Sequence, residues 1–308
     1  MKSVRVFAPA TIANLGCGFD IMGLALDEAG DVLEMTASAG DGLCITNESG
    51  VPLPGDPEAN VITPVVRKFF IMTGLAGHVD VTVRRKIYPG SGIGSSAASC
   101  AAAAFGMNEL FGRPLGATQL VECAMEGELL ASGGRHADNV APALLGGIVL
   151  IRGYEPLDLV RLPVPEGFYC TVVHPQIVVS TKEAREILPK AVPMHDAVAQ
   201  WGNVGGLVAG LYTGDVALVG RAMKDSVAEP YRKRFIPGFD VLREELLAAG
   251  ALAMNISGSG PSVFALSDKR ETAVAAGEIM KSHFASMGVG CSIYVEKVSA
   301  TGAKLLSE

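Results

Sequence analysis

Residues 89–96, with the sequence PGSGIGSS, are the part of this chain whose residue types point most directly to chemistry. The three glycines carry no side chain, so a ligand could approach the main-chain N–H groups closely. The alanine-rich run that follows predicts a helix, whose unpaired N–H groups and positive dipole end face back toward the loop. We expect Ser95 and Ser96 at the N-cap of this helix, with their hydroxyls as further donors. These features predict an anion site, most often one for phosphate; an ordinary capped turn is the alternative.

Two familiar phosphate-binding patterns do not fit this loop. The pattern GxxxxGK[ST] requires a lysine that is missing here. The dinucleotide-binding pattern GxGxxG requires a third glycine where Ser95 stands, and an acidic residue about twenty positions later at the end of a second strand. Glu109 lies inside the predicted helix instead. A dinucleotide-dependent dehydrogenase is therefore a poorly supported alternative.

The elements that position the loop alternate between strand and helix. Val79, Val81 and Val83 alternate with polar residues, which predicts a half-buried strand over 78–87 that leads into the loop. The helix after the loop should end at Gly112-Arg113-Pro114. We expect further strands at 3–8, 31–38, 43–47 and 146–153, and further helices at 60–74 and 118–131.

The pattern changes after a proline-bearing stretch at 157–167, which we interpret as the crossing between two halves. When the consecutive helices of the second half are taken as one, the order is β-α-β-β-α-β, the ferredoxin-like split βαβ. The predicted strands lie at 168–174, 251–257, 262–267 and 291–298, and the helices at about 180–188, 194–213, 215–225, 238–249 and 270–286. The sequence thus predicts an α+β protein with domains at 1–160 and 161–308.

Composition narrows the choice of partners. The chain has 308 residues and a net charge of −7, which gives no general attraction to nucleic acid or to an anionic membrane. The basic clusters at 83–86 and 231–234 are interpreted as solvated faces or local anion sites. No apolar run is long enough to span a membrane, and the first residues do not resemble a signal peptide. Six scattered cysteines without metal-ligand spacing indicate reduced thiols in a cytoplasmic protein.

Three motifs resemble those of the GHMP kinases, the superfamily of galactokinase, homoserine kinase, mevalonate kinase and phosphomevalonate kinase. GSGIGSSAAS at 90–99 resembles the phosphate loop, PATIANLGCGFDIMGLAL at 9–26 the first motif, and ISGSGPSVFAL at 256–266 the third. Against the usual loop pattern PxxxGLGSSAA, Ile93 replaces leucine and the spacing from Pro89 is one residue short. In the first motif, Ile12 stands where serine is common. Within the superfamily, the first motif, RHADNVAPALLGG at 135–147 and STKEAREILPKAV at 180–192 are most similar to homoserine kinases.

The resemblance implies an activity and a fold. The activity is ATP-dependent phosphorylation of the side-chain hydroxyl of L-homoserine to O-phospho-L-homoserine, a threonine precursor, by positioned direct attack on the γ-phosphate. The fold is an N-terminal domain like domain 2 of ribosomal protein S5 and a C-terminal ferredoxin-like domain, with both ligands bound between them. The family also suggests a homodimer.

The resemblance further implies an ATP site and a Mg²⁺ site. Ser96 and Glu128 would hold Mg²⁺, which takes few protein ligands and completes its shell with phosphate oxygens and water. By spacing alone, Glu128 could equally be an exposed helix acid, and Asn60 an N-cap in place of an adenine contact. The implied nucleotide contacts are Asn60, Pro89, Gly90, Ser91, Gly92, Ile93, Gly94, Ser95, Ser96, Ala97, Ala98 and Ser99.

Homoserine brings a carboxylate, an ammonium group and a hydroxyl, and a specific pocket must satisfy each of them. Arg185 and Arg232 are the candidate readers of the carboxylate, because arginine offers a two-pronged donor. Taken alone, either could be a surface charge. The other candidate substrate contacts are Asn14 and Asp20, which could instead close their own loop, His136, which could be structural, and Thr181, which could cap a helix.

Asn139 and Asp138 are the candidate catalytic residues. An asparagine cannot take up a proton, so Asn139 is assigned to orienting the acceptor hydroxyl. Asp138 is either a general base or a structural residue. Positioning and charge stabilisation suffice for much of phosphoryl transfer, because its transition state is loose. Two alternatives remain: a GHMP kinase for another alcohol such as mevalonate or shikimate, and a catalytically silent nucleotide-binding protein.

Overall fold

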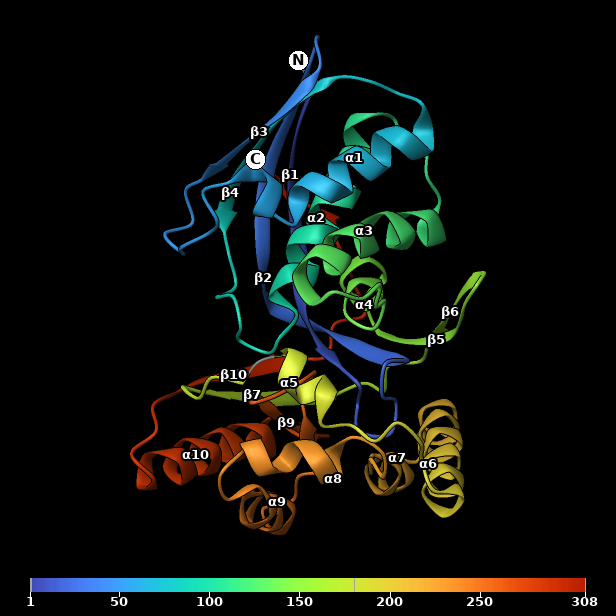
Figure 1. Ribbon diagram of the computed structural model, residues 1–308. Coiled ribbons are helices and arrows are strands. Elements are labelled where there is room, and N and C mark those ends of the chain that lie inside the picture. Colours follow the sequence, from blue (N-terminus) through green and yellow to red (C-terminus); the bar gives the residue numbers. More distant parts are fainter. Residues whose placement is uncertain (1, 180, 308) are drawn as a thin grey trace.

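Two β-sheets organise the chain, whose computed structural model describes residues 2–179 and 181–307 (Figure 1). The first sheet has the order β11-β1-β2-β4-β3, and the hairpin β5–β6 is attached through pairing of β5 with β2. Its strands are β1 (Lys2–Ala13), β2 (Met22–Ser38), β3 (Gly42–Asn47), β4 (His78–Arg85), β5 (Ile148–Tyr154), β6 (Leu157–Leu162) and β11 (Lys304–Leu305).

The helices of the first half cover one face of this sheet, and the alanine-rich α2 lies at their centre (Figure 1). Small side chains allow neighbours to approach α2 closely. A Cβ on Gly127 would lie 2.2 Å from Cys100 Sγ, and one on Gly106 would lie 2.3 Å from Met35 Sδ. Packing on all sides explains why this helix has no polar face. The helices are α1 (Ile62–Thr73), α2 (Ser95–Leu110), α3 (Ala117–Ser132) and α4 (Val140–Leu145), with the short 3-10 turn η1 (Pro57–Ala59) before α1.

The second half is built on an antiparallel sheet of order β10-β7-β9-β8. With its helices this gives the predicted ferredoxin-like arrangement, which is confirmed. The strands are β7 (Tyr169–Pro175), β8 (Ala253–Ile256), β9 (Val263–Ser267) and β10 (Cys291–Lys297). The helices are α5 (Thr181–Glu186), α6 (Met194–Thr213), α7 (Val216–Ala222), α8 (Glu229–Arg232), η2 (Lys233–Phe235), α9 (Phe239–Ala248) and α10 (Arg270–Ser286).

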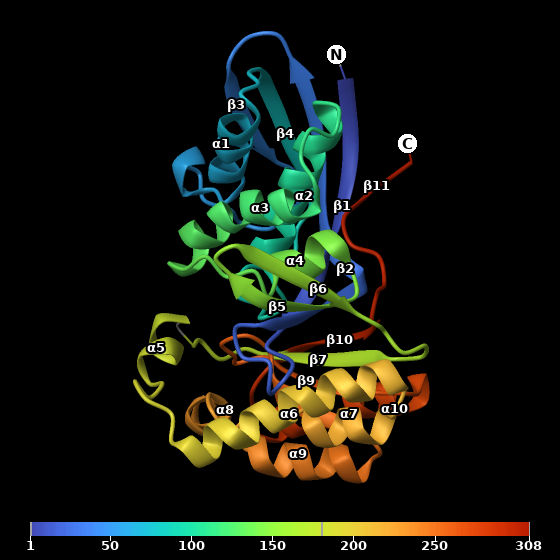
Figure 2. The ribbon, with the colours of Figure 1, turned by 90° about the vertical axis from the view of Figure 1, so that its right-hand side faces the viewer.

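Several parts of the fold differ from the sequence-based expectation, which also lacked the short helices α4 and α8. The stretch 157–167 is not all crossing, because 157–162 forms β6, whose Leu157 and Leu162 are buried. Strand β2 begins at residue 22, well before the expected 31, and its first part pairs with β5 as well as β1. The chain also returns to the first sheet at its end, where Val298 N–H donates to the carbonyl of Phe168 and β11 pairs with β1 (Figure 2).

One hydrophobic core joins the two halves. It contains Ile12 and Leu24 of the first sheet together with Val172 and Phe264 of the second. The two sheets therefore pack against each other at this core, which also contains Ile93, so that loops of both halves come together in space. Those loops hold the three motifs singled out in the sequence.

Candidate active site

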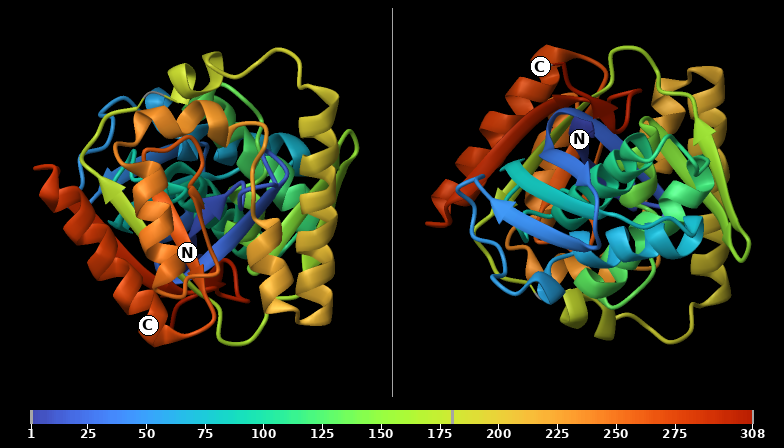
Figure 3. Two further views of the ribbon diagram at one scale, coloured as in Figure 1. Left: turned by 90° about the horizontal axis from the view of Figure 1, so that it is seen from below. Right: turned by 90° about the horizontal axis from the view of Figure 1, so that it is seen from above.

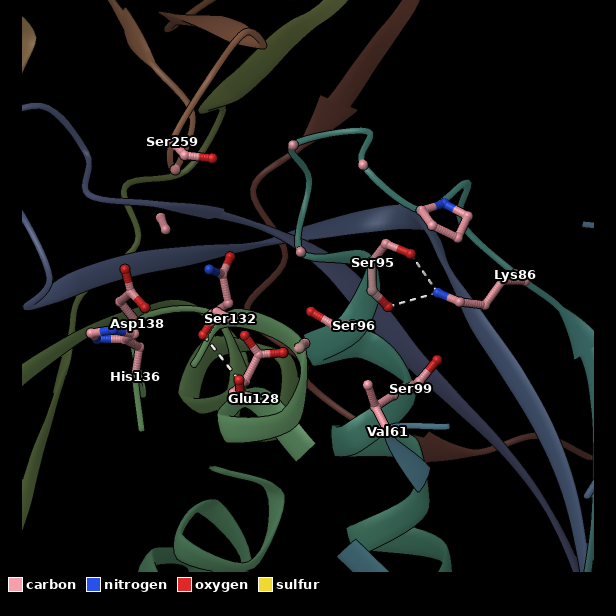
Figure 4. Close-up of a pocket in the computed structure, with 18 of the residues that line it drawn as sticks. Val61, Lys86, Ser95, Ser96, Ser99, Glu128, Ser132, His136, Asp138 and Ser259 are labelled. Carbon is pink, nitrogen blue, oxygen red and sulfur yellow. Dashed lines mark hydrogen bonds between the residues drawn. The ribbon is translucent and has the colours of Figure 1, made fainter. Parts of the chain in front are cut away.

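A cavity of about 440 Å³ lies where these loops meet (Figure 4). Loops from three distant parts of the sequence contribute to it: 13–20, 89–96 and 258–260. Most of the sequence-predicted site residues line it, namely Asn14, Asp20, Asn60, Pro89, Gly90, Gly92, Gly94, Ser95, Ser96, Ser99, Glu128, His136, Asp138, Asn139, Arg185 and Arg232.

Five predicted residues stand apart from this lining. The side chains of Ser91, Ile93, Ala97 and Ala98 are buried in the protein, so a nucleotide contact from these four would come from the main chain and stays a prediction. The side chain of Thr181 lies outside the described part of the structure, although its backbone begins α5.

The phosphate-loop candidate has a backbone that only glycine adopts easily. Gly90, Gly92 and Gly94 have φ values of 80°, 69° and 65°. At Gly94 a Cβ would also lie 2.0 Å from Thr11 Oγ1. Gly94 is the N-cap of α2, so the expectation that Ser95 and Ser96 cap the helix is wrong. Both serines lie in its first turn, beside N–H groups that have no acceptor within the helix.

Carbonyls of this loop are held by neighbouring elements. Ser262 Oγ donates to the carbonyl of Ser91 at 2.7 Å, and Ser257 Oγ donates to the carbonyl of Gly92. The N–H of Thr11 in β1 donates to the carbonyl of Ile93 at 3.1 Å. Sequence reasoning gave no role to these donors, although both serines lie in the third motif. Hydrogen bonds from neighbouring strands and loops thus fix the conformation of this loop.

A buried ion pair lies beneath the loop. Lys86 Nζ is 3.0 Å from Asp31 Oδ2. It also donates to the carbonyl of Ser95 at 2.7 Å (Figure 4). Ser99 Oγ donates to the same carboxylate at 2.6 Å. Burial raises the pKa of Asp31, while the Lys86 charge opposes the shift. Lys86 lines the cavity and was missed, because the sequence placed it in a cluster interpreted as solvated or as a local anion site.

Glu128 and Ser96 face each other from α3 and α2 (Figure 4). Glu128 is only 6% exposed, and its Oε1 has no hydrogen-bond partner among the described residues. Burial raises the pKa of this carboxyl, while its hydrogen bond with Ser96 lowers it. The reading of Glu128 as an exposed helix acid is therefore wrong. A buried carboxylate oxygen without a partner, beside a hydroxyl at a candidate phosphate loop, fits Mg²⁺.

Asn60 takes a local role at the start of α1. Its Oδ1 accepts from the N–H of Ile62 at 3.0 Å, as a capping side chain would. Asn60 also lines the cavity. Its two amide N–H groups are the donors with which it could contact a base.

Hydrogen bonds hold the polar side chains of the loop in the first motif. Asn14 Nδ2 donates to the carbonyl of Gly258 at 2.9 Å, and its Oδ1 accepts from the N–H of Asp20 at 3.0 Å. Arg185 donates from both Nη atoms to the Asp20 carboxylate at 3.1 Å. Asn14 and Asp20 both have positive φ, at 76° and 58°. Such strained backbone persists only where the surroundings enforce it, often at functional sites.

Arg232 is a buried cation on the same side of the cavity. It is 5% exposed, and its Nε and Nη1 donate to the carbonyls of Ala184 and Gly258 at 2.9 Å. The guanidinium lies over the ring of Phe19, 5.0 Å from its centroid. Burial lowers the pKa of this group. Among the described residues only two of its five N–H donors are engaged, both by these carbonyls, so it retains donors for an anion.

His136, Asp138 and Asn139 also line the cavity. Burial, and then the charges of Asp20 and Glu128, raise the pKa of Asp138 to about 7. Burial lowers the pKa of His136. Thr11 Oγ1 donates to Asn139 Oδ1 at 2.8 Å, which leaves the NH₂ group of the amide as a donor without a partner among the described residues.

Comparison with known proteins agrees with this geometry. The family models described as GHMP kinases N terminal domain and GHMP kinases C terminal match residues 60–147 and 207–286. A homoserine kinase of Chlorobium phaeovibrioides is 48% identical over 320 residues, covering 99% of this chain and 100% of the relative. The chain belongs to the homoserine kinase family.

Solved structures extend the comparison. A homoserine kinase from Cytophaga hutchinsonii superposes with a TM-score of 0.93 at 47% identity, covering 99% of this chain and 98% of the other. A mevalonate kinase of L. major superposes with a TM-score of 0.71 at 16% identity, over 96% of each chain, which shows a shared fold. The similarity to homoserine kinases and to the wider GHMP kinase fold thus extends over nearly the whole chain.

Proposed function

We propose that this homoserine kinase family member transfers the γ-phosphoryl group of ATP to the side-chain hydroxyl of L-homoserine, which would serve threonine biosynthesis. One observation carries the proposal. A glycine loop at a helix N-terminus, a buried carboxylate with one oxygen unpartnered among the described residues, and a set of ion-pairing side chains line one cavity. The glycine loop suits a polyphosphate, and the buried carboxylate suits a divalent cation. The ion-pairing side chains suit the charged groups of an amino acid.

The nucleotide end would act mainly through charge. Main-chain N–H groups of the loop and the first turn of α2 would bind the phosphates, and Asn60 would contact the base. Ser96 and Glu128 would hold Mg²⁺, which when bound neutralises charge on the transferred phosphoryl group. Glu128 is deeply buried but lines the cavity, so its carboxylate is within reach of an ion bound there.

The acceptor end would act mainly through position. Arg232 and Arg185 would bind the carboxylate of homoserine, Asp20 and Asn14 its ammonium group, and His136 and Thr181 would complete the pocket. Asn139, with its oxygen bonded to Thr11, would direct its NH₂ group at the attacking hydroxyl oxygen. Holding that oxygen in line with the γ-phosphate supplies much of the rate in a loose transition state.

A substrate panel tests this function. Purified protein with Mg²⁺ and ATP should form phosphohomoserine from L-homoserine, detected by mass spectrometry, and should not turn over mevalonate or shikimate. Those acceptors lack an ammonium group for Asp20. Turnover of mevalonate without homoserine would overturn the assignment, and ATP binding without any product would indicate a silent nucleotide-binding protein.

Asp138 is predicted to be dispensable as a base. We expect Asp138→Asn to keep kcat within about tenfold of the parent, because a loose transition state gains little from a base. A true base would cost about 10²–10⁴-fold on removal. Parent kcat/KM would then also rise as the pH passes about 7, where Asp138 loses its proton. A pH–rate profile of both proteins distinguishes these results.

We further propose that the chain forms a homodimer in the cytoplasm. Met194, Val198, Trp201 and Tyr212 lie on one face of α6 and are between 56% and 71% exposed. This helix lies at the outer edge of the molecule (Figure 3), where it could pack against its copy about a two-fold axis. The free thiols of all six cysteines suit a reducing compartment.

Trp201→Glu should therefore convert the dimer to a monomer, because it places a charge in an apolar interface. Light scattering after size-exclusion chromatography measures the change. Ile71→Glu, at another exposed apolar site, on α1, is the matched control. A dimer that survives Trp201→Glu would place the interface elsewhere.

A further inference from the structure

A histidine outside the cavity is linked to the glycine loop at 89–96 through one serine side chain. His174, near the end of β7, has its Nδ1 2.9 Å from Ser262 Oγ. Ser262 is fully buried and donates to the carbonyl of Ser91 in the loop at 2.7 Å. The packing is tight, because a Cβ on Gly92 would lie 2.5 Å from Ser262 Oγ. A chain of contacts thus runs from an inner strand of the second sheet to the loop.

The direction of each hydrogen bond in this chain follows from counting protons. A hydroxyl has one hydrogen, and Ser262 gives it to the carbonyl of Ser91, which cannot donate. Ser262 Oγ must then accept a hydrogen from His174 Nδ1. His174 therefore carries its proton on Nδ1, and the burial that lowers its pKa favours the neutral ring.

The consequence reaches the amides of the loop. In a trans peptide the N–H points opposite to the preceding carbonyl. With the carbonyl of Ser91 directed at Ser262 and that of Gly92 at Ser257, the N–H groups of Gly92 and Ile93 are directed away from those serines. A serine hydroxyl rotates readily on its own, and the bond from His174 removes that freedom from Ser262.

We propose that His174 is a positioning residue for phosphate binding, acting through Ser262 on the loop at 90–94. The proposal rests on the proposed function only in taking the ligand to be a nucleotide. His174 is absent from the cavity lining, so it would hold the loop in shape without touching ATP.

Calorimetric binding of a non-hydrolysable ATP analogue with Mg²⁺, and separately of L-homoserine, tests this role. His174→Leu should weaken analogue binding about fivefold, the effect of one net hydrogen bond, and leave homoserine binding unchanged. His174→Asn, whose amide can place a donor near the Nδ1 position, should restore most of the affinity. His78→Leu, on β4 and away from the cavity, is the control and should bind as the parent does.

A double-mutant cycle separates positioning from general destabilisation. Ser262→Ala should weaken analogue binding like His174→Leu, and the double variant should be no weaker than the worse single one. Additive losses, equal losses for both ligands, or unchanged analogue affinity in His174→Leu would each overturn the proposal. If the parent binds the analogue in this His174-dependent way yet makes no phosphohomoserine, the proposed function fails and this inference stands.

Discussion

Glu128→Gln is expected to raise the Mg²⁺ concentration needed for half-maximal activity by about 10- to 100-fold. Glutamine keeps the shape of the side chain and an oxygen, but it removes the negative charge beside Ser96. The carboxylate is buried and has one oxygen without a partner among the described residues, so that oxygen is available to bind the ion. Initial rates over a Mg²⁺ titration at saturating ATP and homoserine measure the shift.

Thermal unfolding without ligands separates this effect from loss of structure. Burial raises the pKa of Glu128, so the folded chain holds that proton more tightly than the unfolded chain. Ionisation of Glu128 therefore costs stability as the pH rises above the pKa of the unfolded group. Glu128→Gln should unfold at the same or a higher temperature near neutral pH. Glu122→Gln on the same helix is the control, and an unchanged Mg²⁺ requirement in Glu128→Gln would remove this residue from the ligand set.

Arg232→Met should raise the KM for homoserine about 100-fold and change the KM for ATP by less than about threefold. The methionine retains an apolar stem against Phe19 but loses the donors that the substrate carboxylate would use. Because the site is buried, a carboxylate left without its partner is costly there. Steady-state kinetics with each substrate varied in turn measures both constants.

Arg85→Met is a closely matched control for this variant. Arg85 also donates to two carbonyls, those of Gly30 and Glu28 at 2.9 Å, and lies over an aromatic ring, 5.2 Å from the centroid of Phe7. It is exposed and does not line the cavity. If both variants raised the KM for homoserine alike, or if Arg232→Met affected both substrates equally, the carboxylate would bind elsewhere.

Local patterns in the sequence predicted many of the elements. The alternating valines of β4 and the alanine run of α2 needed no knowledge of distant residues. Strand β6 was missed because prolines follow it directly and suggested a crossing. The short β11 was missed because two residues carry no periodic pattern, and only their pairing with β1 defines them.

The motifs predicted which loops would meet, and tertiary structure decided what their neighbours do. Glu122, Glu126 and Glu128 lie on one helix, and spacing alone does not tell which of them faces inward. Lys86 meets Asp31 only because β2 and β4 pair with Val32 opposite Arg85. The cluster VRRK alone predicts neither this strand pairing nor the burial of Lys86 that results from it.

The return of the chain to the first sheet constrains how the two halves move. The chain passes between them once before β7 and again after β10, where Val298 bonds to Phe168 and Ser299 to Ala25. The bond from Val298 to Phe168 ties the two crossings to each other, and the bond from Ser299 to Ala25 anchors the second crossing to the first sheet. Because the halves also share a hydrophobic core, we expect the loops that line the cavity to keep their alignment with one another.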